Sequence, residues 1–257
     1  MKVVILAGGL GTRLSEETDL RPKPMVEIGG RPILWHIMKL YSQYGHNEFI
    51  ILLGYKGYVI KEYFANYMLH QNDVTIDLKN NSVEAHGNNY ETWKITLLDT
   101  GQDTMTGGRV KFAEKYVGNE TFFLTYGDGL SDINMIEQLA FHRKHGKAVT
   151  MASVVPDGRF GTYEEGLDGR VISFIEKPKA SGSRINGGFF ICDPKVFQYI
   201  DDEKGCVFEK LPLQNLATDG ELYCFKHDGF WKCMDTFKDK LDFSAIWSTN
   251  KAPWKTW

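Results

Sequence analysis

The chain has few cysteines and no long hydrophobic run, and these two absences limit the class of protein. Its four cysteines all lie in the last quarter of the chain, at Cys192, Cys206, Cys224 and Cys233. They have neither C-x-x-C spacing nor a nearby His-x-x-x-His, so we expect reduced, mostly buried thiols rather than a zinc site. No stretch of about 18 apolar residues is present, and the apolar N-terminus is too short for a signal-peptide core. We therefore expect a soluble, cytoplasmic protein with no membrane partner.

The chain also lacks an excess of charge of either sign. Its 30 Lys and Arg residues and 33 Asp and Glu residues give a net charge of −3, and the two signs are interspersed. A nucleic-acid polymer needs a basic patch, so we expect no such partner. The length of 257 residues, 42% of them hydrophobic, is ordinary for a globular chain with one large core. We expect a single domain over residues 1–257.

Predicted strands and helices alternate along the first part of the chain. The strands are expected at 2–7, 48–54, 93–98, 121–126 and 148–154, and the helices at about 31–44, 57–68 and 132–145. This alternation implies βαβ units and a Rossmann-like, mostly parallel α/β sheet. Further strands at 171–175, 187–191 and 222–225 suggest a mixed sheet joined partly by hairpins. The polar insertion between about 69 and 92 is either a surface excursion or an oligomer arm.

A glycine-rich loop follows the first predicted strand. Gly8, Gly9 and Gly11 fall within four residues, so backbone N–H groups of the loop can approach phosphate oxygens. Arg13 adds a planar fork of donors, whereas Lys23, held between two prolines, adds a compact point charge. The sequence therefore predicts a nucleoside triphosphate site with two cations in different roles.

Two aspartates follow later strands and are possible magnesium ligands. Asp128 ends a buried strand between two glycines, and Asp235 lies in a similar strand-to-helix context. Mg²⁺ commonly binds one or two carboxylates and completes its octahedron with water and phosphate oxygens. The alternative for Asp128 is a helix N-cap or a turn. The alternative for Asp235 is a helix N-cap, and Thr236 competes with it for that role.

Three further segments are weaker signals. Lys177, stiffened by the following proline, could hold a second phosphate, or its charged run could simply be solvated. Asn186 and Gly187 could line a hydroxyl-rich ligand, or they could form a strand bulge. The segment from Thr104 to Arg109 could contact a base or ribose, or it could be a plain helix cap with a surface arginine.

Taken in order, several motifs resemble those of the sugar-1-phosphate nucleotidyltransferases. These motifs are L-A-G-G-L-G-T-R-L, R-P-K-P-M, Y-G-D-G, E-K-P, N-G-G-F-F and G-F-W-x-x-M-D-T. The chain is most similar to the cytidylyl branch of that family, and the similarity covers essentially its whole length. The segments 201–214 and 72–90 fit the family pattern loosely.

The resemblance implies a role for particular residues. The implied nucleotide-binding residues are Leu6, Ala7, Gly8, Gly9, Leu10, Gly11, Thr12, Arg13, Lys23, Thr104, Arg109 and Gly127. The implied sugar-phosphate residues are Gly161, Glu176, Lys177, Asn186 and Gly187. Asp128 and Asp235 would bind Mg²⁺, and together with Arg13 and Lys23 they form the implied catalytic set. The nucleotide part would be about 1–130 and the sugar-phosphate part, with the C-terminal region, about 131–257.

The implied reaction is transfer of a cytidylyl group from CTP to glucose 1-phosphate in a homo-oligomer, with a hexamer expected. A sugar 1-phosphate is largely dianionic near neutral pH, so its oxygen can attack the α-phosphorus in line without a protein nucleophile. Alternatives are a pyrophosphorylase for UTP, dTTP or another sugar phosphate, and a regulatory protein that binds sugar nucleotides without turnover. The glycine spacing is not G-x-G-x-x-G, which disfavours a dinucleotide oxidoreductase.

Overall fold

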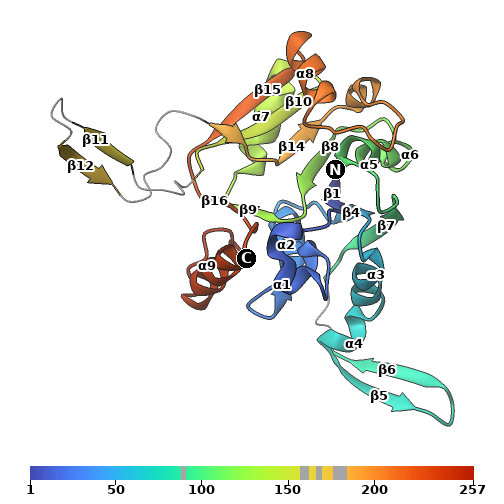
Figure 1. Cartoon of the computed structure of the whole chain (residues 1–257). Helices are drawn as coiled ribbons and strands as arrows, with labels where there is room; N and C mark the ends of the chain where they lie inside the picture. Colours follow the sequence, from blue (N-terminus) through green and yellow to red (C-terminus); the bar gives the residue numbers. More distant parts are fainter. Residues whose placement is uncertain (88–90, 157–161, 166–169, 176–183) are drawn as a thin grey trace.

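A computed structural model of the chain describes residues 1–87, 91–156, 162–165, 170–175 and 184–257. Its principal sheet has eight strands in the order β13-β10-β14-β8-β1-β4-β7, with β15 paired to β10 (Figure 1). The strands are β1 (Lys2–Ala7), β4 (Glu48–Leu53), β7 (Lys94–Asp99), β8 (Phe122–Tyr126), β10 (Val149–Val154), β13 (Ile185–Asn186), β14 (Phe190–Cys192) and β15 (Leu222–His227). β8, β1, β4 and β7 are parallel neighbours, and β14 runs antiparallel to β8 and β10. The predicted mixed α/β fold with a parallel core is confirmed.

The helices connect these strands and cover both faces of the sheet. They are α1 (Ser15–Thr18), α2 (Ile33–Ser42), α3 (Gly57–Ala65), α4 (Tyr67–Gln71), α5 (Thr106–Phe112), α6 (Glu114–Val117), α7 (Met135–His145), α8 (Leu211–Thr218) and α9 (Phe237–Ser248). Three short 3₁₀ helices are η1 (Thr12–Leu14), η2 (Lys23–Met25) and η3 (Pro194–Tyr199). No helix in the described part of the chain is long and apolar enough to cross a membrane.

Alternate residues of β1 supply two hydrophobic cores, one on each face of the sheet. Val3 and Ile5 lie in a core with buried residues of α2 and α9. Val4 and Leu6 lie in a second core with residues of α5 and α8. A strand places successive side chains on opposite faces, so its continuous apolar run is buried on both sides. The tail after α9 adds Trp254 to the first core, where its side chain is fully buried.

Smaller hairpins extend from this body. They are β2 (Glu27–Ile28) with β3 (Arg31–Pro32), β5 (Asp73–Asp77) with β6 (Ser82–His86), and β11 (Thr162–Glu165) with β12 (Val171–Ile175). β9 (Gly129–Ser131) and β16 (Trp231–Cys233), which are distant in the sequence, form a further two-stranded antiparallel sheet. The β5–β6 hairpin projects away from the sheet (Figure 1). It occupies the insertion predicted between about 69 and 92 and is called the arm below. The helix predicted over 57–68 is two helices, α3 and α4, separated at Asn66.

All four cysteines are free thiols, as expected. Their burial differs from the prediction, because Cys192 is buried whereas Cys224, on β15, is exposed and the other two are intermediate. β15, which contains Cys224, pairs with β10 on the side away from β14, and Cys224 is among its exposed residues.

Candidate active site

The predicted phosphate loop and Asp128 meet at one edge of the parallel sheet. β1 pairs with β8 so that Leu6 lies opposite Tyr126, and the N–H of Gly127 donates a hydrogen bond of 2.9 Å to the carbonyl of Leu6. β1 ends at Ala7 and β8 ends at Tyr126, so both strands leave the sheet close to this pair. Because parallel strands end at the same edge, the loop and the aspartate are brought together from distant parts of the sequence.

This edge opens into a cavity of about 570 Å³. The lining includes every residue predicted to bind the nucleotide, together with both predicted metal-binding aspartates. It also includes six residues that the prediction did not contain: Pro24, Gln102, Asp103, Met105, Thr106 and Tyr126. The structure thus gathers segments separated by more than two hundred residues into one site.

The ammonium group of Lys23 lies at the centre of this site. Its Nζ donates to Asp128 Oδ2 at 2.6 Å and to Asp235 Oδ1 at 2.7 Å. Arg13, with 67% of its side chain exposed, contacts the other oxygen of Asp235 at 3.0 Å. η2 and its flanking prolines fix the backbone at Lys23. Two carboxylates from different strand ends therefore converge on one cationic position.

Burial and charge act against each other on these groups. Burial would lower the pKa of Lys23, but the charges and hydrogen bonds of Asp128 and Asp235 raise that pKa above its ordinary value. Burial would raise the pKa of Asp235, but the hydrogen bond and charge of Lys23, with the charge of Arg13, hold that pKa below its ordinary value. Lys23 and Asp235 are therefore both charged at neutral pH.

Neither aspartate caps a helix, which excludes the N-cap role considered for both; Asp128 does lie in the turn between β8 and β9. The N-cap of α7 is Asn134, whose side chain accepts from two backbone N–H groups. The N-cap of α9 is Thr236, which forms a capping box with Asp239. The carboxylates of Asp128 and Asp235 are therefore directed to the site.

Arg109 is 4% exposed and holds the phosphate loop from behind. Its guanidinium donates to the carbonyls of Gly8, Leu53, Gly101 and Gln102 and to the hydroxyl of Thr100, at 2.5 to 3.1 Å. A Cβ atom on Gly8 would lie 2.4 Å from this group, so only glycine fits there. This arrangement is not the surface arginine considered above, and it is called the Arg109 clamp below.

Thr104 adjoins the clamp and is also buried. Its hydroxyl donates to the carbonyl of Thr100 at 2.5 Å. Thr104 and Arg109 therefore both line the cavity while their polar groups hold the protein's own loops. Contact of either residue with a nucleotide stays a prediction.

A second cavity, of about 360 Å³, adjoins the first. The two share the four residues Arg13, Tyr126, Asp128 and Asp235. Asn186 and Gly187, predicted to lie near the sugar phosphate, line this second cavity with Glu209 and Trp231. The predicted sugar-phosphate residues Gly161, Glu176 and Lys177 lie outside the described residues.

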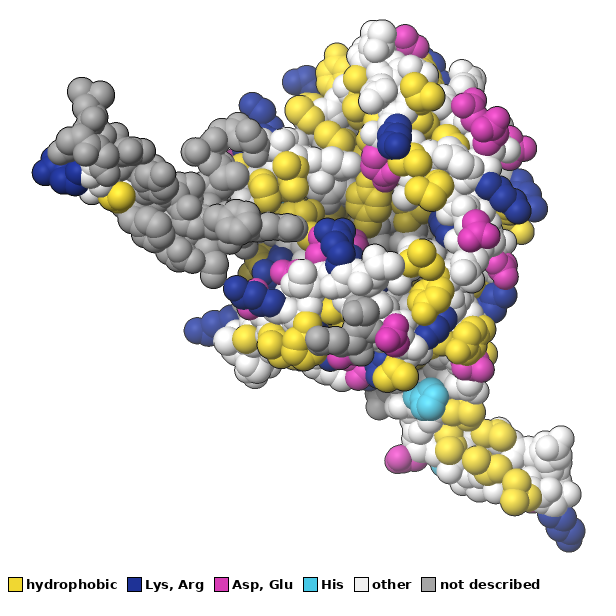
Figure 2. Space-filling view, viewed as in Figure 1, with side chains coloured by type: hydrophobic (Ala, Val, Ile, Leu, Met, Phe, Trp, Pro, Cys, Tyr) yellow, Lys and Arg dark blue, Asp and Glu magenta, His cyan; other side chains and the backbone are white. Residues whose placement is uncertain are grey.

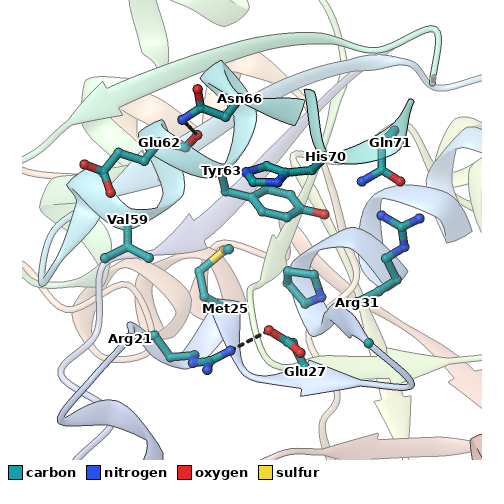
Figure 3. A pocket seen from close by; sticks show the side chains of 12 residues that line it. Arg21, Met25, Glu27, Arg31, Val59, Glu62, Tyr63, Asn66, His70 and Gln71 are labelled. Carbon is teal, nitrogen blue, oxygen red and sulfur yellow. Dashed lines mark hydrogen bonds and ion pairs between the residues drawn. The ribbon is translucent and has the colours of Figure 1, made fainter. Parts of the chain in front are cut away.

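Another cavity, of about 700 Å³, lies elsewhere and contains none of the predicted site residues. It is lined by the β2–β3 hairpin and by α3 and α4, next to the base of the arm (Figure 3). Arg21 and Glu27 form an ion pair of 2.6 Å across its wall. No described group of three or more His, Cys, Asp or Glu side chains in the molecule could hold a metal ion alone.

The fold and the two joined cavities define a nucleotide-transferring enzyme. The family model for nucleotidyl transferases matches residues 2–248, and the chain belongs to that family. The chain is 55% identical over 258 residues to the glucose-1-phosphate cytidylyltransferase of Salmonella typhimurium, with 100% of both chains covered. It is 49% identical over 257 residues to the probable glucose-1-phosphate cytidylyltransferase of Bacillus subtilis, again with 100% of both covered. Among solved structures, HddC from Yersinia pseudotuberculosis is similar with a TM-score of 0.69 and 25% identity, covering 96% of this chain and 99% of that one.

Proposed function

We propose that this protein transfers the cytidylyl group of CTP to α-D-glucose 1-phosphate, releasing CDP-glucose and pyrophosphate. The observation that carries the proposal is the pair of joined cavities that share Arg13, Asp128 and Asp235. One cavity has the glycine-rich loop and suits a triphosphate, whereas the other has Asn186 and suits a hydroxyl-rich ligand. The full-length similarity to enzymes named for this reaction supports the choice of CTP and glucose 1-phosphate.

In this proposal the protein positions two anions and neutralises their charge. The loop amides and Arg13 hold the phosphates that leave as pyrophosphate, and Lys23 stabilises charge that grows on the α-phosphoryl oxygens. The sugar phosphate oxygen attacks the α-phosphorus in line, and the bond from that phosphorus to the pyrophosphate oxygen breaks. Asn186 binds the sugar phosphate, together with Glu176 and Lys177.

Nucleotidyl transferases generally depend on Mg²⁺, and the residues here fit that ion. Asp128 and Asp235 already direct one carboxylate oxygen each at a single cation, the ammonium of Lys23. A site with only two carboxylates suits Mg²⁺, which takes its other ligands from water and phosphate. We propose that these two aspartates hold the ion, which would neutralise phosphate charge when bound.

We also propose a division of labour along the chain. Residues of about 1–130 would bind the nucleotide, and residues of about 131–257 would bind the sugar phosphate, although both parts contribute strands to one sheet. Because both substrates are metabolites of the cytoplasm, we expect the enzyme to act there.

Substrate choice is tested by pyrophosphate release from the purified protein. CTP, UTP, dTTP, GTP and ATP would each be combined with glucose 1-phosphate, and CTP would be combined with other sugar 1-phosphates. We expect the highest kcat/KM for CTP with glucose 1-phosphate. A higher value for another pair would correct the substrates, whereas binding of CTP with no pyrophosphate release from any pair would contradict the enzyme itself.

We further propose that the arm joins copies of this chain, with a hexamer as the expected assembly. The register of β5 and β6 places Val74, Ile76, Val83 and Ala85 on one face of the hairpin and polar residues on the other. Ile76 and Val83 are 58% and 54% exposed, and hydrophobic side chains gather along the arm in Figure 2. An isolated two-stranded hairpin is marginally stable in water, so covering this face by a second copy would stabilise it.

Sedimentation velocity would test the arm. Ile76→Lys places a charge on the apolar face, and Ser82→Lys places the same charge on the polar face as a control. We expect the first variant to shift towards smaller species and the control to match the parent. A monomeric parent protein, or an unchanged assembly in Ile76→Lys, would contradict this role of the arm.

A further inference from the structure

Glu209 lies between the two cavities and accepts a hydrogen bond from each side. Its Oε2 accepts from the hydroxyl of Thr106 at 2.6 Å, and its Oε1 accepts from the hydroxyl of Tyr126 at 2.7 Å. Thr106 begins α5 and lines the nucleotide cavity, whereas Glu209 lines the sugar-side cavity. One carboxylate therefore connects the two parts of the site.

The direction of each hydrogen bond can be assigned from the number of protons available. An ionised carboxylate only accepts, so Tyr126 gives its single proton to Glu209. The oxygen of Tyr126 then accepts from Asn186 Nδ2 at 3.2 Å, and Asn186 Oδ1 accepts from the N–H of Gly188 at 2.8 Å. This chain of donors and acceptors fixes which end of the Asn186 amide faces Tyr126. The amino group carries a second N–H, which is the donor that Asn186 can offer to a ligand hydroxyl.

The hydrogen bonds of Thr106, on the nucleotide side of Glu209, can be assigned in the same way. The hydroxyl of Thr106 accepts from the backbone N–H of Phe208 at 2.9 Å, and its one proton goes to Glu209. The first turn of α5 is thereby tied to the segment that contains Glu209. That turn follows Thr104 and Met105, which line the nucleotide cavity.

The ring of Tyr126 has little freedom to leave this position. It packs edge-on against Phe190, with ring centroids 5.9 Å apart. Gly188 has a φ of +73°, and a Cβ atom there would lie 2.8 Å from the ring. Burial raises the pKa of Tyr126 well above its ordinary range, and the negative charge of Glu209 raises it further, so the hydroxyl stays protonated.

We propose that Glu209 is a positioning residue that orients Asn186 for the sugar phosphate through Tyr126 and holds the start of α5 beside the nucleotide through Thr106. The proposal rests on the proposed function, because it assigns the second cavity to the sugar phosphate. It adds a residue from the segment 201–214, which fits the family pattern loosely, to the determinants of sugar binding.

The test is steady-state kinetics of Glu209→Gln, Tyr126→Phe and Thr106→Val. Gln has the shape of Glu but carries an NH₂ group in place of one acceptor oxygen, so it can no longer receive both protons. We expect Glu209→Gln and Tyr126→Phe to raise KM for glucose 1-phosphate by about tenfold, with a smaller change in KM for CTP. Thr106→Val, which keeps the side-chain shape, should raise KM for CTP and leave KM for glucose 1-phosphate near that of the parent.

A double variant separates this role from a general structural one. If Glu209 acts on the sugar through Tyr126, then Tyr126→Phe/Glu209→Gln should bind glucose 1-phosphate no more weakly than Tyr126→Phe alone. Additive losses, or an unchanged KM for glucose 1-phosphate in either single variant of an active enzyme, would overturn the proposal. A parent protein that does not use glucose 1-phosphate would instead overturn the proposed function. Should Glu209→Gln not fold, an unchanged KM for glucose 1-phosphate in Tyr126→Phe, which removes one oxygen atom, would still overturn the proposal.

Discussion

Replacing Lys23 by methionine is expected to destabilise the protein in a way that Mg²⁺ reverses. The change removes the cation that Asp128 and Asp235 share, while leaving a side chain of similar length. Removing one partner of a buried ion pair costs about 3–5 kcal/mol. The side chains of Lys23, Asp128 and Asp235 are 13%, 27% and 11% exposed, so partial solvation favours the lower end of that range. For a domain of this size, about 3 kcal/mol corresponds to a fall in Tm of about 6–12 °C.

Mg²⁺ should then act differently on the variant and on the parent. In the variant, Asp128 and Asp235 lose the cation that they share, although Arg13 still pairs with Asp235. A divalent cation that binds the native state there stabilises it by mass action. In the parent, the ammonium of Lys23 already lies between the two carboxylates, and the ion must displace it. We therefore expect Mg²⁺ to raise the Tm of Lys23→Met clearly more than that of the parent, in the absence of nucleotide.

The measurement is thermal unfolding followed by circular dichroism, with and without millimolar MgCl₂. Lys94→Met is the matched control, because Lys94 pairs with Glu48 at 3.1 Å but has 78% of its side chain exposed. Such an exposed, solvent-screened pair contributes little to stability, so the control should melt close to the parent at either Mg²⁺ level. If Lys23→Met melts like the parent, the ion pairs of Lys23 do not stabilise the protein. If Mg²⁺ raises the Tm of the variant and of the parent equally, Mg²⁺ does not take the place of the ammonium.

Four other changes have definite expected outcomes. Asp235→Ala should lose about 10²–10³ in kcat while keeping the parent's circular dichroism spectrum, and near-normal turnover would remove it from the mechanism. Arg13→Lys should also slow pyrophosphate release, because a point charge replaces the two-pronged set of donors of the guanidinium. Kinetics like those of the parent would exclude the proposed contact of Arg13 with pyrophosphate. Gly8→Ala should lower Tm because its Cβ would lie 2.4 Å from the buried guanidinium behind the loop, whereas Gly9→Ala, with nothing within 4 Å, should not; equal melting would contradict this. Burial lowers the pKa of His36 to about 4, below its unfolded value of 6.5, so the unfolded chain binds more protons between these two pH values. The free energy of unfolding should therefore fall by roughly 3 kcal/mol as pH decreases from 6.5 to about 4. Urea unfolding measured across this pH range should show a weaker dependence on pH in His36→Gln than in the parent.

The elements that are fully apolar were predictable from the sequence, and the elements that depend on partners were not. β1 spans the predicted residues 2–7. Its short, continuous apolar run is typical of a strand that is covered on both faces of a sheet. The pairing of β9 with β16 was not anticipated, since both strands have only three residues. Their pairing nevertheless matters, because it brings Asp235 next to Asp128.

The site shows the same limit at the level of single side chains. Lys23, Asp128 and Asp235 could be predicted because each stands next to a glycine, a proline or a strand end that marks it. Glu209 has no such marker, and its two partners are 83 and 103 residues away in the sequence. Its role depends on which hydroxyl groups the fold places beside it, so only the structure could identify it.

The charges of the nucleotide cavity explain how the site can be stable before substrates bind. Among the described residues that line it, Arg13, Lys23 and Arg109 are balanced by Asp103, Asp128 and Asp235, so three positive and three negative charges sum to zero. A triphosphate entering alone would add uncompensated negative charge beside two aspartates. In the proposed function, a triphosphate that entered with Mg²⁺ would supply a cation to those aspartates and would release Lys23 to the phosphates. The ion pairs that stabilise the protein would then be the contacts exchanged when the nucleotide binds.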